Sequence, residues 1–398
     1  MKKILVILVM LVAMNASAQW VQMNGPNGGT VWSLAASSSN IFLGADSGVF
    51  LSTNNGSNWI NKGLTGQSIM SLAISGSNIF AGNGNGVYLS SNNGTNWIAV
   101  NSGLTTLAVK ALAVKGSNIF AGTYYGGVFL SSNNGSNWTA VNNGLTNHIV
   151  WSFAVSGSNI FVGNWGGGVF LSTNNGTNWT AVNNGLTYHS IWSLAVSGSY
   201  IFAGTFAGGV FLSTNNGTNW TAVNNGLTNP FIHSLVFSGA NILTGTDDGV
   251  FLSTNNGTSW INKNQGFNGY KEITELLITN NYIFAVDYGN SIWRRSLSEI
   301  IGIQNISTEI PEMFFLSQNY PNPFNPSTVI RFQTTVTGNV SLKVYDVQGR
   351  EVRTLVNESL KPGTYEAAFD ASSLNTGVYF YKLITNTFSE TKKMLLIK

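Results

Sequence analysis

The chain has 398 residues, of which only 8% are charged, against about 25% in an average soluble protein. Hydrophobic residues make up 43% and glycine fills 45 positions, which excludes charge-driven disorder and favours many short strands joined by tight turns. The formal net charge is +3 and cysteine is absent, so disulfides, thiolate metal sites and thiol nucleophiles are excluded.

The first 18 residues have the pattern of a cleaved signal peptide. Lys2 and Lys3 precede an apolar run over residues 4–14, and small residues at 16–18 form a cleavage site. The apolar run is about half the ~20 residues that a membrane helix needs, and no later segment is long and apolar enough to span a bilayer. We therefore expect a secreted protein without a transmembrane segment, whose mature chain begins near Gln19.

Without the two signal lysines, the chain is close to neutral. Residues 19–300 carry seven basic and seven acidic side chains, and residues 301–398 carry nine and eight. Binding of nucleic acid by a basic face is therefore not expected.

A segment of the form SxNNGxxW recurs six times. Three short β-rich runs separated by Gly, Ser and Asn turn residues precede each copy, and a fourth run follows it. Four strands per ~40–45 residues are typical of a β-propeller blade. The segments end at Trp59, Trp97, Trp138, Trp179, Trp220 and Trp260, with spacings of 38, 41, 41, 41 and 40 residues.

The first three runs of this pattern occur seven times. The seventh unit lacks the repeated segment and the fourth run, whereas residues 20–25 resemble the fourth run of the other units. We therefore predict an all-β fold with a seven-bladed β-propeller over residues 19–298, closed by the N-terminal strand. Closure would remove the open sheet edges that a linear array leaves. The units start near Val31, Ile69, Val109, Ile149, Ile191, Ile232 and Ile273.

The SxNNGxxW segment resembles the Asp-box (BNR repeat) of β-propellers such as sialidases, sortilin-type receptors and photosystem II assembly factors. The resemblance covers about residues 20–296 and implies a structural turn between the third and fourth strands, away from the functional face. In such a turn a short polar side chain caps the hairpin, Gly adopts a positive φ and Trp covers the blade edge. Asn occupies the family's Asp position at Asn54, Asn92, Asn133, Asn174, Asn215 and Asn255.

The sequence changes character after Glu299, and we expect a linker over residues 299–315. Alternating runs separated by Pro-Gly and Gln-Gly turns predict a small Ig-like β-sandwich over residues 316–398. This tail, from LSQNYPNPFNPS at Leu316 to TKKMLLIK at Lys398, is very similar to the C-terminal sorting domain (type A) of type IX secretion substrates. The resemblance implies that the type IX machinery is its partner. It also implies a location outside, or on the outer surface of, a Bacteroidota-type bacterium.

Candidate functional residues lie where the repeats differ from one another. In propellers the loop between the second and third strands and the loop between blades open on one face, opposite the repeated turn. These loops are aromatic mainly in units 3 to 5 and acidic in units 6, 7 and 1, which are neighbours in a closed ring. The candidate ligand-binding residues are Tyr124, Tyr125, Trp165, Phe206, His148, Tyr188 and His189, and the acidic sector is Asp46, Asp247, Asp248 and Asp287.

An aromatic sector on a neutral face suits stacking against sugar rings or capture of an extended peptide. For Trp151 and Trp192, which lie within the repeated strand pattern, we favour packing between blades. We interpret the acidic sector as solvated carboxylates, with Ca²⁺ binding and glycoside hydrolysis by two carboxylates as alternatives. The three histidines have no regular spacing, so no metal site is expected from them.

We therefore favour a monomeric, non-catalytic binding module for glycans or protein partners, without a cofactor. The alternatives are a glycoside hydrolase that uses carboxylates of units 6, 7 and 1, and a purely structural surface protein. Sialidase activity is disfavoured because Arg294 and Arg295, adjacent in one strand, are the propeller's only arginines, so the family's arginine triad is absent. Neither a nucleophile elbow nor a phosphate-binding loop occurs.

Overall fold

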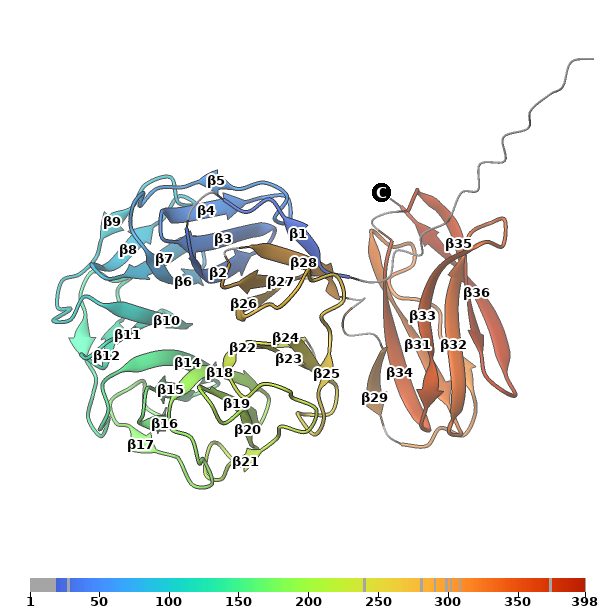
Figure 1. The fold of residues 1–398 in the computed structure, drawn as a ribbon. Helices are drawn as coiled ribbons and strands as arrows, with labels where there is room; N and C mark the ends of the chain where they lie inside the picture. The colour runs from blue at the N-terminus through green and yellow to red at the C-terminus, as the bar shows by residue number, and fades with distance from the viewer. Residues whose placement is uncertain are drawn as a thin grey trace, which may run out of the picture.

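The computed structural model describes residues 19–26, 29–238, 241–279, 282–289, 291–297, 300, 303–307, 309–371 and 374–397. The signal peptide predicted over residues 1–18 lies outside the described residues. The named elements are β-strands, so the predicted all-β class is confirmed. They form a ring of sheets and a second unit of two sheets (Figure 1).

The ring consists of seven four-stranded antiparallel sheets built from β1 to β28. The sheets surround a common centre, as the blades of a β-propeller do (Figure 1). The innermost strands are β2 (Val31–Ser37), β6 (Ile69–Ser75), β10 (Val109–Lys115), β14 (Val150–Ser156), β18 (Ile191–Ser197), β22 (Ile232–Ser238) and β26 (Ile273–Ile278).

The second and third strands of each sheet form most of the core, because both of their faces pack against neighbouring sheets. The second strands are β3 (Asn40–Ala45), β7 (Asn78–Asn83), β11 (Asn118–Thr123), β15 (Asn159–Asn164), β19 (Tyr200–Thr205), β23 (Asn241–Thr246) and β27 (Tyr282–Asp287). The third strands are β4 (Gly48–Ser52), β8 (Gly86–Ser90), β12 (Val128–Ser131), β16 (Gly168–Ser172), β20 (Val210–Ser213), β24 (Gly249–Ser253) and β28 (Ile292–Ser296). The outermost strands are β5 (Ile60–Asn61), β9 (Ile98–Ala99), β13 (Thr139–Ala140), β17 (Thr180–Ala181), β21 (Thr221–Ala222), β25 (Ile261–Asn262) and β1 (Val21–Met23).

The repeated SxNNGxxW segment forms a tight turn between the third and fourth strands. In the first copy, Ser52 Oγ donates to Asn54 Oδ1 at 3.0 Å and accepts from Gly56 N at 2.8 Å. Asn54 Oδ1 also accepts from Asn58 N at 2.9 Å. Asn55 and Gly56 have φ angles of 54° and 79°, in the left-handed region that Asn and Gly tolerate best. The same bonds recur in the other copies, so Asn supports this turn without the family's Asp.

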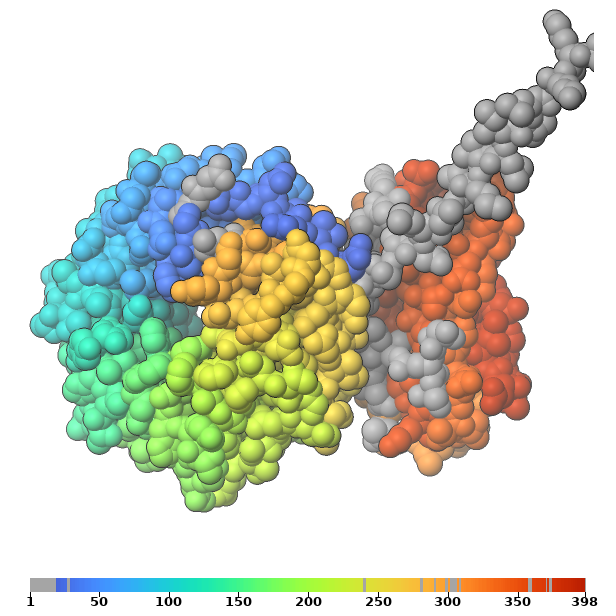
Figure 2. Space-filling model, viewed as in Figure 1, coloured from blue at the N-terminus to red at the C-terminus, as the bar shows by residue number. Residues whose placement is uncertain are grey.

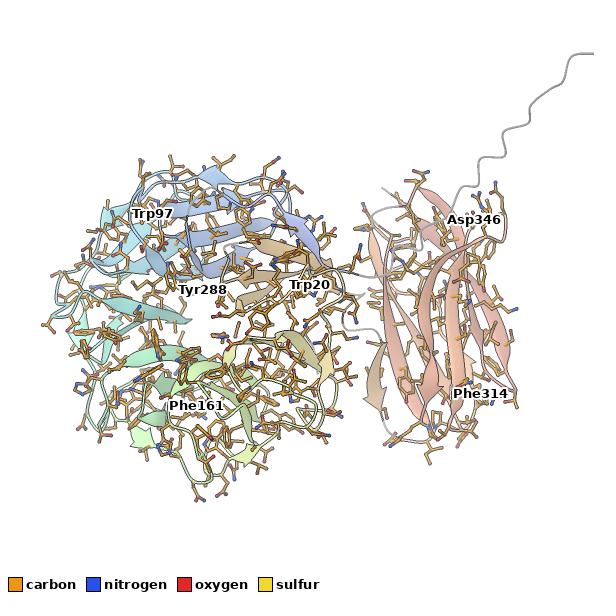
Figure 3. All side chains as sticks on the ribbon, in the orientation of Figure 1. Trp20, Trp97, Phe161, Tyr288, Phe314 and Asp346 are labelled. Atoms are coloured by element: carbon orange, nitrogen blue, oxygen red, sulfur yellow. The ribbon has the colours of Figure 1, made fainter. Side chains whose placement is uncertain are left out.

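The tryptophan at the end of the repeated segment joins its sheet to the preceding one. The indole Nε1 of Trp97 donates to the backbone oxygen of Lys62 at 2.8 Å, and four later tryptophans make equivalent bonds. Trp20 makes the same bond to the backbone oxygen of Lys263, also at 2.8 Å, although no repeated segment precedes it. Figure 3 labels Trp20 and Trp97. The N-terminal segment therefore takes the structural place of the missing fourth strand.

Strand β1 joins the two ends of the ring. It pairs with β28 in an antiparallel register that places Val21 opposite Arg294. In addition, Phe284 from the last sheet shares a buried cluster with Val31 from the first sheet. The backbone pairing covers the edge of β28, and the shared core opposes separation of the first and last sheets.

Each innermost strand has a β-bulge after its first residue. In β2 the register shifts between Val31 and Ser33, and the other six strands show the same irregularity. A bulge leaves its extra residue unpaired and redirects that side chain. We call these extra residues the bulge positions, and all seven line the centre of the ring: Trp32, Met70, Lys110, Trp151, Trp192, His233 and Thr274.

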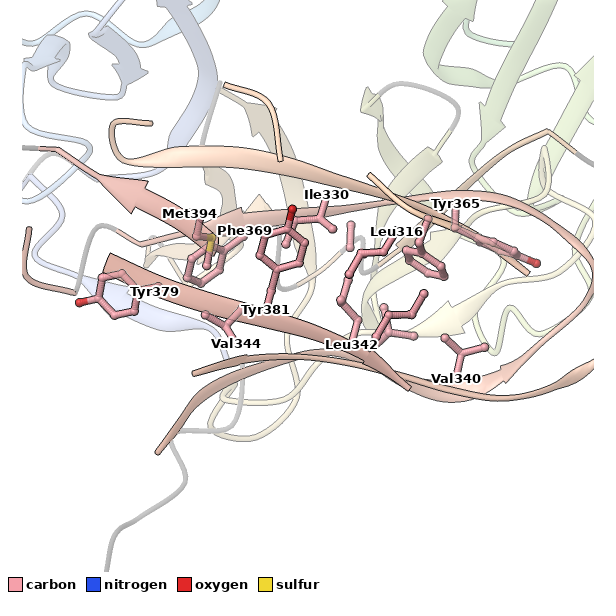
Figure 4. Packing of buried hydrophobic residues seen from close by; sticks show 14 of the residues in the cluster. Leu316, Ile330, Val340, Leu342, Val344, Tyr365, Phe369, Tyr379, Tyr381 and Met394 are labelled. Atoms are coloured by element: carbon pink, nitrogen blue, oxygen red, sulfur yellow. The ribbon is translucent and has the colours of Figure 1, made fainter. Parts of the chain in front are cut away.

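The second unit is a sandwich of two four-stranded sheets whose facing sides share one core. Buried side chains of that core include Leu342, Tyr365 and Tyr381 (Figure 4). The Tyr381 hydroxyl donates to Ser317 O and accepts from Asn319 N, both at 2.8 Å, and burial raises its pKa to about 12. One sheet contains β29 (Ile303–Ser307), β34 (Gly363–Asp370), β31 (Ser327–Thr334) and β30 (Phe315–Leu316), and the other contains β33 (Glu351–Leu360), β32 (Gly338–Tyr345), β35 (Gly377–Ile384) and β36 (Ser389–Leu396).

The segment expected as a linker, residues 299–315, contains the strand β29. This strand pairs with β34 and so extends one sheet of the sandwich. Its sequence, IQNIS, is too short and too weakly patterned to predict a strand. The available edge of an existing sheet, rather than local propensity, explains why it adopts this conformation.

Candidate functional site

The centre of the ring contains a cavity of about 500 Å³, which is within the size range of small-molecule sites. Figure 2 shows the ring hollowed near its centre. The cavity wall includes the bulge positions, the residues that follow them on the innermost strands, Glu272, and Tyr288, which Figure 3 labels near the centre of the ring.

At the cavity mouth, bulge positions contact the loop residue that lies fourteen positions later in the same sheet. Trp32 Nε1 donates to Asp46 Oδ1 at 2.7 Å, and His233 Nε2 lies 2.5 Å from Asp247 Oδ1. Two positions whose residue types vary from repeat to repeat therefore contact each other at the cavity mouth. The other such pairs are Lys110 with Tyr124, Trp151 with Trp165, and Trp192 with Phe206.

Contacts between neighbouring sheets connect several of these pairs into a continuous surface. Its rings have centre-to-centre separations of 4.8–6.2 Å. Trp165 and Phe206 are 36% and 38% exposed, while their contacts with one another hold them in place. Exposed, mutually packed rings form a rigid apolar surface suited to stacking. We call this surface the aromatic band: Tyr124, Trp151, Trp165, Trp192, Phe206 and Phe231.

Tyr125 extends the aromatic band outward. Its ring centre lies 4.4 Å from that of Tyr124, and the side chain is 67% exposed. Its φ is 146°, a conformation that costs energy for any residue except glycine. The corresponding position of the next repeat is Gly166. Tyr125 thus presents an aromatic ring at a strained loop position.

The other three predicted ligand-binding residues lie outside the aromatic band. Tyr188 is 47% exposed and packs so closely over Gly208 that a Cβ there would lie 2.2 Å from the tyrosine ring. His148 and His189 are exposed, and their backbone oxygens accept hydrogen bonds from glycine amides. In the described part of the chain, neither imidazole has a hydrogen-bond partner, so the structure assigns these two side chains no contact with the cavity.

Lys110 places an ammonium group against the aromatic band. Its Nζ lies 5.1 Å from the ring centre of Trp151 and 5.8 Å from that of Tyr124, which is cation–π geometry. Burial lowers the pKa of this ammonium group. Among the described residues, no hydrogen bond or carboxylate pairs with Lys110, which lines the cavity wall.

A second group, which we call the acid–histidine cluster, consists of His233, Asp247 and Glu272. His233 Nε2 lies 2.5 Å from Asp247 Oδ1 and 3.9 Å from Glu272 Oε1, and one polar atom from each residue lies within 4.8 Å of the others. The imidazole packs on Trp192 with ring centres 4.7 Å apart, so the cluster adjoins the aromatic band. Burial, together with the carboxylates of the cluster, raises the pKa of Tyr270.

Asp46 is held by three hydrogen bonds. It accepts from Trp32 Nε1 at 2.7 Å, from Ser68 Oγ at 2.9 Å and from Thr30 N at 2.9 Å. Burial alone would raise the pKa of its carboxyl, but these donors hold it below the ordinary value. Asp46 therefore positions Trp32 at the cavity mouth.

The two remaining predicted acids are engaged elsewhere. Asp248 accepts a hydrogen bond from the Thr228 hydroxyl. Asp287 is buried, with Oδ2 3.1 Å from Lys271 Nζ and 2.9 Å from Trp293 Nε1. The predicted acids thus have separate partners, and the close carboxylate neighbour of Asp247 is Glu272 instead.

Glu275 lines the cavity one residue after the bulge position Thr274. In the other six sheets this place holds Ser or Ala opposite a glycine, as in Ser193 opposite Gly204. In the last sheet, Glu275 instead stands opposite Val286. Burial raises the pKa of the Glu275 carboxyl to about 8, and within the described residues no hydrogen bond or ion pair involves it.

The repeat pattern predicted the exposed loop residues better than the cavity wall. Trp151 and Trp192, interpreted as packing between blades, do contact neighbouring sheets, but they also line the cavity. Lys110, Glu272 and Glu275 were not predicted as site residues. The residues of the cavity wall could have been predicted from one feature of each repeat. That feature is the second residue of the innermost strand, paired with the loop residue fourteen positions later.

No helix in the described part of the chain is long and apolar enough to cross a membrane. Residues 318–398 match the family model described as the secretion system C-terminal sorting domain. This match confirms the resemblance of the tail and indicates export by type IX secretion to the exterior or the cell surface. A search of curated protein sequences found no match.

Solved structures similar to this chain are β-propellers. YCF48 bound to a D1 peptide has a TM-score of 0.57 at 12% identity, covering 70% of this chain and 96% of that chain. PorZ, a surface component of the type IX secretion system of Porphyromonas gingivalis, has a TM-score of 0.56 at 14% identity, covering 94% and 60%. The GH74 enzyme of Niastella koreensis has a TM-score of 0.51 at 18% identity, covering 68% and 43%. At these identities the likeness shows the fold alone.

Proposed function

We propose that this protein is a secreted, non-catalytic binding module that holds its ligand at the mouth of the central cavity. Each four-stranded sheet is one blade of a seven-bladed propeller, β1 completes the last blade, and the sandwich is an Ig-like sorting domain. The observation that carries the proposal is the aromatic band. Its six packed rings lie together at the cavity mouth, and the remaining sheets form the same fold without such a cluster of rings.

A glycan is the ligand class that this surface fits best. The apolar faces of sugar rings stack on Trp and Tyr side chains, and Trp165 and Phe206 offer exposed faces there. Polar groups beside the band, including Lys110 and Glu272, can bond to sugar hydroxyls. Because the rings are held by one another, binding orders few side chains and so loses little conformational entropy.

An extended protein segment is the second ligand that the surface could hold. Exposed aromatic rings in a groove also capture apolar peptide side chains. YCF48, which shares the fold at low identity, was solved with a D1 peptide. Binding of peptides rather than glycans would leave the location of the site unchanged.

Glycoside hydrolysis is the alternative activity, and one observation favours it. Carboxylate oxygens of Asp247 and Glu272 lie within 4.8 Å of each other at the cavity mouth, close to the ~5–5.5 Å separation of the two carboxyl groups in retaining glycosidases. This pair replaces the sequence-based hypothesis that Asp46, Asp248 and Asp287 take part.

The test compares ligand binding by residues 19–398 and by two variants on glycan and peptide arrays. The double variant Trp165→Ala/Tyr125→Ala should lose about tenfold or more in affinity, on the order of the stacking of two rings. Tyr320→Ala, which removes an exposed tyrosine of the sorting domain, is the matched control and should bind as the wild type does. Equal binding by all three proteins would refute the proposed site.

The same preparations, incubated with the bound glycans, test the enzyme alternative. Release of reducing ends by the wild type, but not by Asp247→Asn/Glu272→Gln, would establish hydrolysis and overturn the non-catalytic assignment. Binding without any release supports the binding module.

A further inference from the structure

One basic and one acidic side chain line the central cavity without a partner in the described parts of the protein. One is the ammonium group of Lys110, which lies over the rings of Trp151 and Tyr124. The other is the carboxyl group of Glu275, which has no hydrogen bond and no ion pair. The other charged or titratable groups of the wall are Tyr288 and the two residues His233 and Glu272, which belong to the acid–histidine cluster.

Lys110 and Glu275 stand on facing walls of the cavity. Contacts between innermost strands run from β2 through β6, β10, β14, β18 and β22 to β26, and from β26 back to β2. Strand β10, which carries Lys110, is therefore three sheets from β26 in one direction and four in the other. Figure 1 shows β10 and β26 on opposite sides of the ring's centre. The two groups thus face each other across the cavity instead of forming an ion pair side by side.

Each of these two unpartnered groups lowers the stability of the folded protein. A charged or polar group removed from water without a partner destabilises the folded state. Other sheets show that the fold does not require Glu275, because Ser or Ala fills the equivalent place opposite a glycine. Likewise, Met70 and Thr274 occupy bulge positions equivalent to Lys110. The energetic cost is explained if a ligand supplies the missing partners.

We propose that the cavity binds a zwitterionic group, with the anionic part of the ligand at Lys110 and its ammonium part at Glu275. The aromatic rings of Trp151 and Trp192, which line the wall between them, would contact the apolar part of the ligand. The inference rests on the proposed function in one respect, that the ligand enters at this cavity mouth. It adds the charge pattern that the ligand must carry.

The experiment measures binding to residues 19–398 by isothermal titration calorimetry. The probes are aminohexanoate and aminooctanoate. Diacids and diamines of matching length serve as comparisons, because they carry only negative or only positive groups. The variants are Lys110→Met, which keeps an apolar stem against Trp151, and Glu275→Gln, which keeps the shape of the side chain. The matched control is Lys115→Met on the same strand, because Lys115 bonds to Ser158 O and Asn175 Oδ1 and does not line the cavity.

The wild type and Lys115→Met should bind one amino acid probe about tenfold more tightly than its matching diacid or diamine. Lys110→Met should lose the advantage over the diamine, and Glu275→Gln the advantage over the diacid. Equal or absent binding of all probes by the wild type would overturn the inference, as would loss of preference in Lys115→Met alone. If the array ligand still binds at the aromatic band in that case, the proposed function stands while the zwitterion inference fails. Circular dichroism spectra of each variant separate lost binding from lost folding.

Discussion

The indole Nε1 of Trp20 donates a hydrogen bond to the backbone oxygen of Lys263, 243 residues later in the chain, at 2.8 Å. The Trp20 ring also stacks on Phe267, with ring centres 5.0 Å apart and planes 13° apart. The bond reproduces the contact that the tryptophans of five repeated segments, from Trp97 to Trp260, make with the preceding sheet. The N-terminal segment therefore joins the ring through the same tryptophan contact that links neighbouring sheets elsewhere in the ring.

Trp20→Ala should destabilise the ring by about 3–5 kcal/mol, because it removes a large side chain that is only 2% exposed. Trp138→Ala, the equivalent change within a repeat, should cost a similar amount. Urea unfolding followed by tryptophan fluorescence measures both, and Trp165→Ala at the cavity mouth is the surface control. A loss below about 1 kcal/mol for Trp20→Ala would show that the N-terminal strand does not close the ring.

Ser172→Ala should destabilise the repeated turn of its sheet by about 1–3 kcal/mol. The Ser172 hydroxyl accepts a hydrogen bond from the buried Gly176 N at 2.8 Å, and its loss leaves that donor without a partner. Thr173→Ala, an exposed position in the same turn, is the control and should leave the unfolding midpoint unchanged. Equal midpoints for Ser172→Ala and the wild type would show that the buried amide finds another acceptor.

Glu275 should make the ring less stable as the pH rises from about 4.5 to 8. Burial raises its folded-state pKa from 4.5 to about 8, so the folded protein binds more protons than the unfolded chain in that window, and stability falls as the pH increases. Glu275→Gln should remove this fall and be more stable than the wild type at pH 8 by on the order of 4 kcal/mol. Thermal unfolding at pH 5 and pH 8 measures the difference. A wild type and variant with the same pH dependence would contradict the assignment of this titration to Glu275.

Much of the fold could be predicted because the sequence repeats itself. The regular position of the tryptophans and glycines predicts the strands of each sheet, and the likeness of residues 20–25 to a fourth strand predicts the pairing of β1 with β28. Strand β29 could not be predicted, because only the edge of β34 makes IQNIS a strand.

The candidate site was only partly predictable, because only some of its residues depart visibly from the repeat pattern. The variable loop residues Trp165 and Phe206 stand out from the repeat pattern. Lys110 and Trp192 do not, because nothing in a strand's alternation shows that a bulge turns its second residue toward the cavity. Glu275 replaces the Ser or Ala of the other sheets, and Val286 replaces the glycine opposite it. The sequence alone does not show that these two changes place an unpaired carboxyl in the cavity wall.

The crystal structure of residues 19–398 with the tightest ligand from the arrays tests the central claim most directly. Our account predicts that the ligand lies at the cavity mouth, with atoms within about 4 Å of the Trp165 and Phe206 rings. A ligand bound to the outer edge of the ring, or to the turns around Asn54 and its equivalents, with the aromatic band uncovered, would contradict it.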